Sequence, residues 1–120
     1  MKIDPFKISY PKQRIVEIKE KVEMFPWHEM PKEGGWSFGT NIDYMKNLAD
    51  YWTKKYDWES QEFRLNQQPN NITKVDDIDI HFIFKKSSSP KAIPLILIHG
   101  WPGSIVEFME IIKPLCEPEK

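Results

Sequence analysis

The first apolar pattern along the chain has the spacing of a helix. Ile15, Ile18, Val22 and Phe25 recur at intervals of three and four residues, which places them on one helical face. Proline is tolerated in a first turn, where its missing N–H would have no partner, and the residue before a proline disfavours helix. The pattern therefore predicts a helix from about Pro11 to Met24, with Pro26 ending it.

A second helical pattern follows a glycine-rich stretch. Either Thr40 or Asn41 is suited to cap this helix, and Asp43 fits a Thr-x-x-Asp capping box. Lys54 and Lys55 lie near its expected C-terminus, where the helix dipole favours cations. We expect the aromatic members of its apolar stripe to pack in a core. The stripe consists of Ile42, Met45, Leu48, Ala49, Trp52 and Tyr56.

The period then changes from that of a helix to that of strands. Apolar residues alternate with others from Ile78 to Phe84, and Asp76-Asp77 before them is a turn signal, which makes 72–75 a hairpin partner. Residues 95–98 are continuously apolar, which is typical of a strand buried on both faces. A capping box from Ser104 to Glu107 then opens a helix with a buried face of Phe108, Met109, Ile112 and Leu115. The order predicts the opening of an α/β sheet.

Composition narrows the functional classes. The chain has 120 residues, which is sufficient for one compact domain. It has 17 basic and 18 acidic residues, so it lacks the excess of positive charge that is typical of nucleic-acid-binding proteins. Its single cysteine, Cys116, excludes an intrachain disulfide framework and favours a reducing, intracellular and cytoplasmic setting. Neither a signal peptide nor a transmembrane run is visible, since the longest uninterrupted apolar run is 95–98.

Gly35-Trp36-Ser37-Phe38-Gly39 matches the G-x-S-x-G pattern of a serine nucleophile elbow. An elbow needs a hydrophobic strand before it and a helix directly after it. The preceding residues 26–33 contain two prolines and three charges, so they do not form a buried central strand. We therefore interpret Ser37 as part of an ordered aromatic loop and not as a nucleophile.

The segment His99-Gly100-Trp101-Pro102-Gly103-Ser104 follows the predicted buried strand, where functional groups of open α/β sheets gather. Its glycines allow a sharp turn, and backbone amides near a helix N-terminus stabilise negative charge. The phosphate-loop and dinucleotide-binding fingerprints are both absent. An oxyanion hole needs only one or two aimed N–H groups, so this chemistry fits the loop better.

These residues, "HGWPGS" followed by "EF", resemble the microsomal-type epoxide hydrolases, which include the juvenile-hormone epoxide hydrolases. Further segments agree in the same order, and the similarity extends from about Phe6 to Leu115. They are "FKISYPKQRIVEIKEKV", "GGWSFGTNIDYMKNLADYWTKKYDW", "FRLNQ", "IDIHFIF" and "PLILIHGWPGS". The resemblance implies the first part of an α/β-hydrolase fold. Residues 1–115 would be an epoxide hydrolase N-terminal domain, with 6–70 its helical segment, 71–115 the start of the core and 116–120 a tail.

In such enzymes an aspartate on a later elbow opens the epoxide and forms an ester. A histidine oriented by an acid then activates water to hydrolyse that ester, and tyrosines from a cap bind the epoxide oxygen. The resemblance implies that none of these groups lies in this chain. It assigns the oxyanion hole and site floor to His99, Gly100, Trp101 and Pro102, with the Trp101 backbone N–H as donor. It also gives Ser37 the role of a substitutable loop position.

Other candidates have plainer interpretations. His81 is expected to be exposed or half-buried, His28 lies in a loop, and three isolated histidines with one cysteine show no metal spacing. Ser104 is expected to cap its helix, and the acidic neighbours of Cys116 do not favour a thiolate. Trp36 is a candidate for pocket lining, although packing is the favoured interpretation. None of the aspartates follows a buried strand in an elbow, namely Asp43, Asp50, Asp57, Asp76, Asp77 and Asp79.

Two functional classes remain. The first is an epoxide hydrolase of which this chain is the N-terminal part, with a small-molecule epoxide as substrate and without a cofactor. The second is a stand-alone, non-catalytic binding module. In either class the apolar strand at 95–98 predicts self-association or binding of a complementing hydrolase fragment, because an unpaired apolar strand edge pairs readily with another chain.

Overall fold

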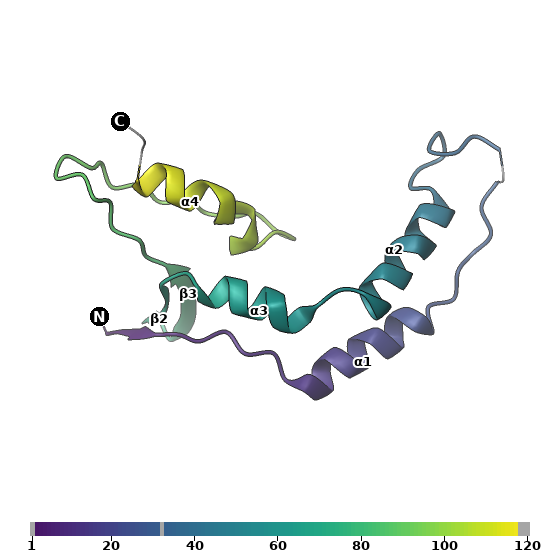
Figure 1. Ribbon diagram of the computed structural model, residues 1–120, viewed down its shortest axis with the longest axis horizontal. Helices are drawn as coiled ribbons and strands as arrows, with labels where there is room; N and C mark the ends of the chain where they lie inside the picture. The colour runs from purple at the N-terminus through teal and green to yellow at the C-terminus, as the bar shows by residue number, and fades with distance from the viewer. Residues whose placement is uncertain (1, 32, 118–120) are drawn as a thin grey trace. The chain divides into compact units, whose positions relative to one another are not determined.

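The computed structural model describes residues 2–31 and 33–117. The chain divides into two compact units, one formed by Ser9–Gln61 and the other by Met1–Ile8 together with Glu62–Lys120. Figure 1 draws the helices of both units as coiled ribbons and the strands as arrows. Within the described residues, no helix is long and apolar enough to cross a membrane.

The unit formed by Ser9–Gln61 is helical. Helix α1 covers Lys12–Glu23 with Pro11 as N-cap, and α2 covers Ile42–Lys54 and packs against α1. The Asn41 side chain caps α2, since its Oδ1 accepts a hydrogen bond from the Tyr44 backbone N–H at 3.0 Å. Both predicted helices are confirmed, and the choice between Thr40 and Asn41 falls on Asn41.

The prediction that Trp52 packs in a core is wrong. Its side chain is 39% exposed, whereas Tyr56 is half-buried and Leu48 is also exposed. Helix α1 packs against α2, but Leu48 and Trp52 of the stripe remain exposed. The stripe predicted from its spacing is present, but the described residues do not bury it.

Helix α3, Trp58–Asn66, was not predicted from the sequence. Asp57 caps it, because its Oδ1 accepts the Ser60 N–H at 3.0 Å. The helix was missed because it is only nine residues long and has a weak apolar periodicity. Asp57 had been considered only as a catalytic carboxylate and not as a helix cap.

Strands β1, Ile3–Pro5, β2, Asn70–Val75, and β3, Ile78–Ile83, form an antiparallel sheet in the order β1-β2-β3. The hairpin between β2 and β3 is confirmed, with Val75 opposite Ile78. Asp76 and Asp77 have φ angles of 48° and 64°, as required at both central positions of a type I′ turn. The three-residue β1 was missed because it is too short to show an alternation.

Side-chain amides fasten the N-terminal strand region to the rest of its unit. Asn66, at the end of α3, accepts from the Ile8 backbone N–H at 2.9 Å and donates to the Ile8 carbonyl at 2.8 Å. The Thr73 hydroxyl donates to the Lys2 carbonyl at 2.7 Å. These bonds join backbone segments far apart in sequence and satisfy polar groups that would otherwise be unpaired.

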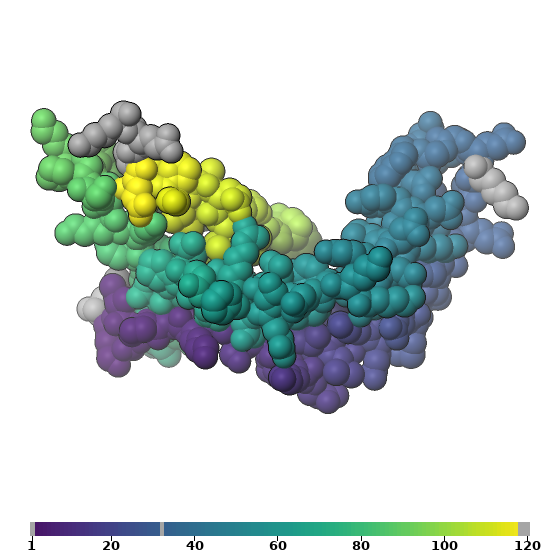
Figure 2. All heavy atoms as spheres, viewed as in Figure 1, coloured from purple at the N-terminus to yellow at the C-terminus, as the bar shows by residue number. Residues whose placement is uncertain are grey.

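The prediction of a buried strand at residues 95–98 is wrong, because these residues form no strand and are exposed. Their side chains are 40–85% exposed. Figure 2 shows in green, at the surface, the chain that leaves β3 toward them. A strand in the middle of a parallel sheet needs neighbouring strands on both sides. Among the described residues the sheet ends at β3, and no strand pairs with 95–98. The segment is also not helical, so the α/β interpretation stands.

The helix expected from Ser104 begins as a 3₁₀ turn, η1, Ile105–Phe108, and continues as α4, Met109–Cys116. The Ser104 hydroxyl accepts from the Val106 N–H at 3.3 Å, so its capping role is confirmed. The expected buried face is formed only in part, since Met109 is buried and Leu115 is 50% exposed. An ion pair between Arg64 and Glu110 joins α3 to α4.

The hydrophobic core of the described chain is small. Only Ile8 and Met109 among the apolar side chains are buried, each 9% exposed. Protein interiors normally contain a contiguous cluster of buried apolar side chains for each domain. The elements are therefore regular, while most of their apolar surface remains uncovered.

Candidate functional site

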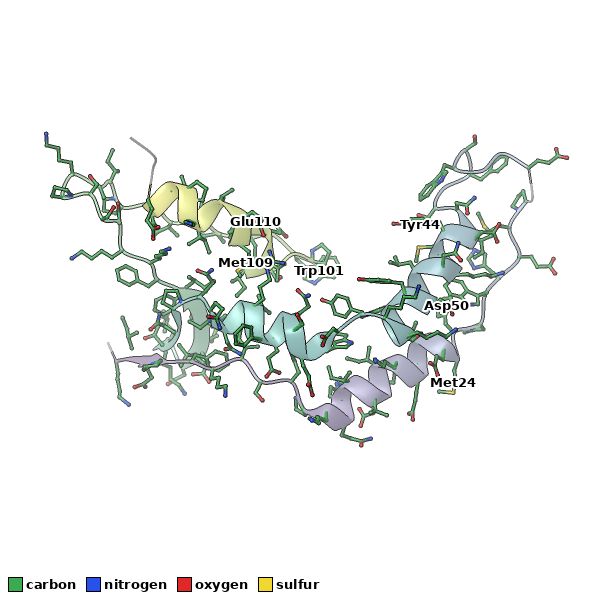
Figure 3. All side chains as sticks on the ribbon, viewed as in Figure 1. Met24, Tyr44, Asp50, Trp101, Met109 and Glu110 are labelled. Carbon is green, nitrogen blue, oxygen red and sulfur yellow. The ribbon has the colours of Figure 1, made fainter. Side chains whose placement is uncertain are left out.

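The loop between residue 98 and η1 forms a tight, closed turn. The Gly103 backbone N–H donates to the Gly100 carbonyl at 2.7 Å, which encloses Trp101 and Pro102. The peptide bond between these two residues is cis. Figure 3 shows Trp101 on this loop, ahead of Met109 and Glu110 on the first turn of α4. The loop and the helix that follows it are the parts expected of an oxyanion-hole segment.

Trp101 is the most exposed of the large apolar residues described, at 97%. Its backbone N–H makes no hydrogen bond within the part of the chain that the structure describes. A buried N–H without a partner is costly, whereas an exposed one at a turn is available to an external acceptor. Trp101 is thus exposed at the turn, and the role of its N–H as the oxyanion donor stays a prediction.

Gly103 has a steric role in the same turn. A Cβ atom at this position would lie 1.6 Å from Glu107 Oε1 and 2.8 Å from the Gly100 carbonyl oxygen. The carboxylate is the end of a flexible side chain and can move, but the carbonyl belongs to the turn itself. A larger residue at 103 would therefore open the turn that presents Trp101.

His99 is exposed and lies beside the turn. Its Nδ1 is 3.4 Å from the Gly100 carbonyl oxygen, and it contacts no carboxylate among the described residues. A histidine base in hydrolases is oriented by a second group, usually an acid. That His99 shapes the turn and does not act as the base stays a prediction.

The loop that carries Ser37 lacks the geometry of a nucleophile elbow. No strand precedes it within residues 24–31 and 33–41, and α2 begins only at Ile42. The Ser37 backbone N–H donates to the Gly34 carbonyl at 2.8 Å, in a turn whose Gly34 and Gly35 have positive φ angles. Ser37 therefore lies in an ordered glycine loop, as the interpretation of its sequence context predicted.

Trp36, the candidate for pocket lining, packs against Tyr44 at the start of α2. The ring centroids are 5.3 Å apart and Trp36 remains 59% exposed. Packing, the favoured interpretation, is what the structure shows within this unit. A role for Trp36 in lining a substrate pocket stays a prediction.

His81 has a local structural partner. It is half-buried on β3, its Nε2 lies 3.0 Å from Asn70 Oδ1, and the Phe6 ring packs on it at a centroid distance of 5.0 Å. Burial lowers the pKa of His81 below its ordinary value of 6.5, because desolvation disfavours the charged imidazolium. His28 is exposed in the loop after α1. The positions of both residues agree with the sequence-based interpretation.

Cys116 is half-buried at the end of α4 and forms no disulfide. Its Sγ lies 3.5 Å from the Lys85 carbonyl, and its own carbonyl accepts a bond of 2.9 Å from the Ser87 hydroxyl. The cysteine thus holds the segment after β3 to the end of α4. Within the described residues, no three side chains of histidine, cysteine, aspartate or glutamate come together as metal ligands do.

The helical unit also contains a pocket that sequence reasoning missed. It has a volume of about 380 Å³ and lies at the C-terminal end of α2 and the start of α3. Its lining is Leu48, Tyr51, Trp52, Tyr56 and Trp58. A second, more polar hollow of about 450 Å³ lies between the C-terminal end of α1 and α2. The signal for the aromatic pocket was the dense run of tryptophan and tyrosine from 51 to 58, of which Trp52 and Tyr56 were interpreted as helix core.

Comparison with known proteins identifies the family to which the chain is similar. Residues 3–108 match the family described as epoxide hydrolase N terminus. Juvenile hormone epoxide hydrolase 1 of Ctenocephalides felis is 38% identical over 120 residues, covering 97% of this chain and 26% of that protein. The chain thus spans about a quarter of the length of the curated relatives that it matches.

Solved structures of epoxide hydrolases also superpose on the chain. The juvenile hormone epoxide hydrolase of Bombyx mori matches with a TM-score of 0.84 and 32% identity, over 99% of this chain and 32% of that one. The Aspergillus niger epoxide hydrolase matches with a TM-score of 0.85 and 30% identity, over 94% of this chain and 30% of that one. These neighbours confirm the predicted fold class, the opening part of an α/β-hydrolase. The chain belongs to the epoxide hydrolase N-terminus family.

Proposed function

We propose that this chain is the N-terminal part of an epoxide hydrolase that converts epoxides to vicinal diols through an aspartyl-ester intermediate. A carboxylate outside the chain attacks an epoxide carbon, which forms the ester bond and breaks one C–O bond of the ring. Water then attacks the ester carbonyl, releases the diol and regenerates the carboxylate. This chain contributes the oxyanion-hole loop and supplies neither nucleophile, base nor acid.

The observation that carries the proposal is the turn from Gly100 to Gly103. It is closed by its own backbone bond and leaves the Trp101 N–H without a hydrogen-bond partner among the described residues. During ester hydrolysis, negative charge develops on the carbonyl oxygen, and an aimed N–H in a water-excluded site stabilises this charge. Within the complete enzyme, the Trp101 ring would line the epoxide pocket, and His99 and Pro102 would shape the floor of the site.

A second candidate, a non-catalytic binding or complementing module, is favoured by a different observation. The described residues bury only Ile8 and Met109 as apolar core, while the side chains of 95–98 lie open. Exposed apolar surface of this extent marks an interface. The partner in this interpretation is a second copy of the chain or a complementing hydrolase fragment. The intracellular, cytoplasmic location that Cys116 favours stays a prediction.

Diol formation from styrene oxide tests the proposal in two samples. The first is the chain alone, and the second is a chimera in which the chain replaces the matching third of the Bombyx mori enzyme. We expect no activity from the chain alone, because it lacks nucleophile and base, and measurable activity from the chimera. Diol formation by the chain alone that survives Ser37→Ala, His99→Ala and Trp101→Ala would contradict the proposal. A folded but inactive chimera would favour the binding module.

A further inference from the structure

Glu107, on η1, has a carboxylate to which the proposed function gives no role. The backbone of Glu107 is fixed, because its N–H donates to the Ser104 carbonyl at 3.1 Å and Met109, two residues later, is buried. Side chains of helical residues lean back over the preceding turn, where residues four apart are neighbours. The Glu107 side chain therefore extends toward Gly103, at the end of the loop that carries Trp101.

The Glu107 carboxylate lies against Gly103. A Cβ atom at position 103 would stand 1.6 Å from Glu107 Oε1 and 2.7 Å from its Cδ, so the carboxylate occupies the space that a side chain at 103 would take. Gly103 is also the residue whose N–H closes the turn onto the Gly100 carbonyl at 2.7 Å. Glu107 thus contacts the closing residue of the turn that exposes Trp101.

No other described group binds this carboxylate. In a complete capping box, Glu107 would accept a hydrogen bond from the Ser104 backbone N–H. Ser104 caps the helix through its own hydroxyl, but among the described residues the Glu107 carboxylate forms neither the reciprocal bond nor an ion pair. Glu110, one turn later, is instead paired with Arg64. The Glu107 carboxylate is therefore not held away from the turn by a competing partner.

We propose that Glu107 is a positioning residue of the oxyanion-hole loop, which holds the turn from Gly100 to Gly103 closed and keeps the Trp101 N–H aimed at the ester oxygen. The contact depends on shape, so a carboxamide would provide it as well as a carboxylate. A negative charge beside the loop opposes the negative charge that develops on the ester oxygen, so the charge of Glu107 is not what the loop requires. The inference rests on the proposed function and adds a residue that acts through Trp101.

The first test uses the isolated chain and needs no activity. Exchange of the Gly103 amide with water, measured by magnetisation transfer in NMR, reports how often the turn opens. We compare Glu107→Ala with Glu107→Gln, because both lack the charge and only the glutamine keeps the contact. We expect several-fold faster exchange in Glu107→Ala, and no change in Glu110→Ala, which removes a carboxylate one turn later. Equal Gly103 exchange in Glu107→Ala and Glu107→Gln would overturn the proposal.

The second test uses the Bombyx mori chimera in single turnovers, which separate ester formation from ester hydrolysis. We expect Glu107→Ala to slow hydrolysis about 10-fold, less than loss of the donor itself would, and to leave ester formation unchanged, since the donor acts on the ester carbonyl. Glu107→Gln should hydrolyse the ester at least as fast as the unmodified chimera. Combined with Trp101→Pro, Glu107→Ala should have no further effect, because the donor that it positions is already absent.

The outcomes separate this role from a general structural one and from the proposed function. Equal slowing of ester formation and hydrolysis in Glu107→Ala, or slowing that persists beside Trp101→Pro, would overturn the proposal. Hydrolysis as slow in Glu107→Gln as in Glu107→Ala would overturn it too, since the charge would then be the cause. A folded but inactive chimera would contradict the proposed function, and Gly103 exchange in the isolated chain would still decide whether Glu107 holds the turn.

Discussion

At the scale of single residues, polar side chains in the unit that contains the three-stranded sheet have specific hydrogen-bond partners, although few apolar side chains are buried around them. Asn70, 6% exposed, donates to the Leu65 carbonyl and meets His81 across the β2–β3 pair. Asn66 bonds both backbone groups of Ile8. Such interactions between side chains and backbone fix geometry where hydrophobic contacts are few.

The titration of His81 tests this local environment. Its pKa lies below 6.5 in the folded chain, so between the two values the unfolded chain binds more protons. The contribution of neutral His81 to the free energy of unfolding is therefore fully present above pH about 6.5, and it is lost as the pH falls through the pKa of the folded chain. Titration followed by NMR should give a value below 6.5 for His81, and Phe6→Ala should raise it by letting water reach the ring. A wild-type value above 6.5 would contradict the burial of His81.

At the scale of elements, the helices and the hairpin follow local signals, and these were readable in the sequence. Asn41 caps α2, Ser104 caps η1, and the Asp76-Asp77 turn sets the register of β2 and β3. The competition between Thr40 and Asn41 was not decidable from residue type, because both are good caps. The structure identifies Asn41 as the cap, because its Oδ1 accepts a hydrogen bond from the Tyr44 N–H.

The capping assignment gives a prediction with a matched control. Asn41→Ala should cost about 1 kcal/mol of helix stability, since it leaves the Tyr44 N–H without its acceptor. Thr40→Ala, one residue earlier, should cost much less. Hydrogen exchange of the amides in the first turn of α2 measures the difference. About fivefold faster exchange is expected in Asn41→Ala. Equal effects of the two substitutions would show that the cap is shared or wrongly assigned.

The elements that sequence reasoning missed or misjudged depend on contacts beyond their own residues. Strand β1 is defined by pairing with β2, where Ile3 lies opposite Thr73, and not by a pattern of its own. The exposure of Trp52 and of residues 95–98 depends on which neighbours are present, which no local spacing records. The turn around Trp101 was the better-predicted part of the site, because its glycines permit a sharp turn and its proline fixes one backbone angle. The aromatic pocket lined by Leu48 and the rings from 51 to 58 was not predictable, since its shape depends on how four aromatic rings are oriented relative to one another.

At the scale of the whole chain, the two units have regular elements but little buried apolar surface. Family relatives extend over about four times the length of this chain, so the proposed enzyme has other parts that can cover this surface. Residues 95–98 present large, exposed apolar side chains without regular secondary structure. An unpaired apolar segment of this kind readily pairs with strands of other chains. Association is therefore the behaviour we predict for the chain alone.

Sedimentation velocity at tens of micromolar should show species heavier than the monomer, in the concentration range where exposed apolar segments aggregate. Introducing Ile96→Lys and Ile98→Lys together, at side chains 83% and 85% exposed, should shift the chain toward monomer. Val16→Lys, on the exposed side of α1, is the control for added charge alone. A wild-type chain that sediments as a sharp monomer, with strong amide protection across 95–98, would mean that the chain is a complete domain.

The most direct test of the account is the Trp101 backbone N–H itself, in the Bombyx mori chimera. Trp101→Ala removes the ring and keeps the N–H, whereas Trp101→Pro removes both, and circular dichroism establishes that both variants fold. The account predicts that ester hydrolysis in single turnovers is about 100- to 1,000-fold slower in Trp101→Pro than in Trp101→Ala, since one oxyanion donor is lost. The covalent ester should then accumulate in mass spectra of quenched Trp101→Pro. Equal hydrolysis rates in the two variants, without accumulation of the ester, would contradict the role of this loop.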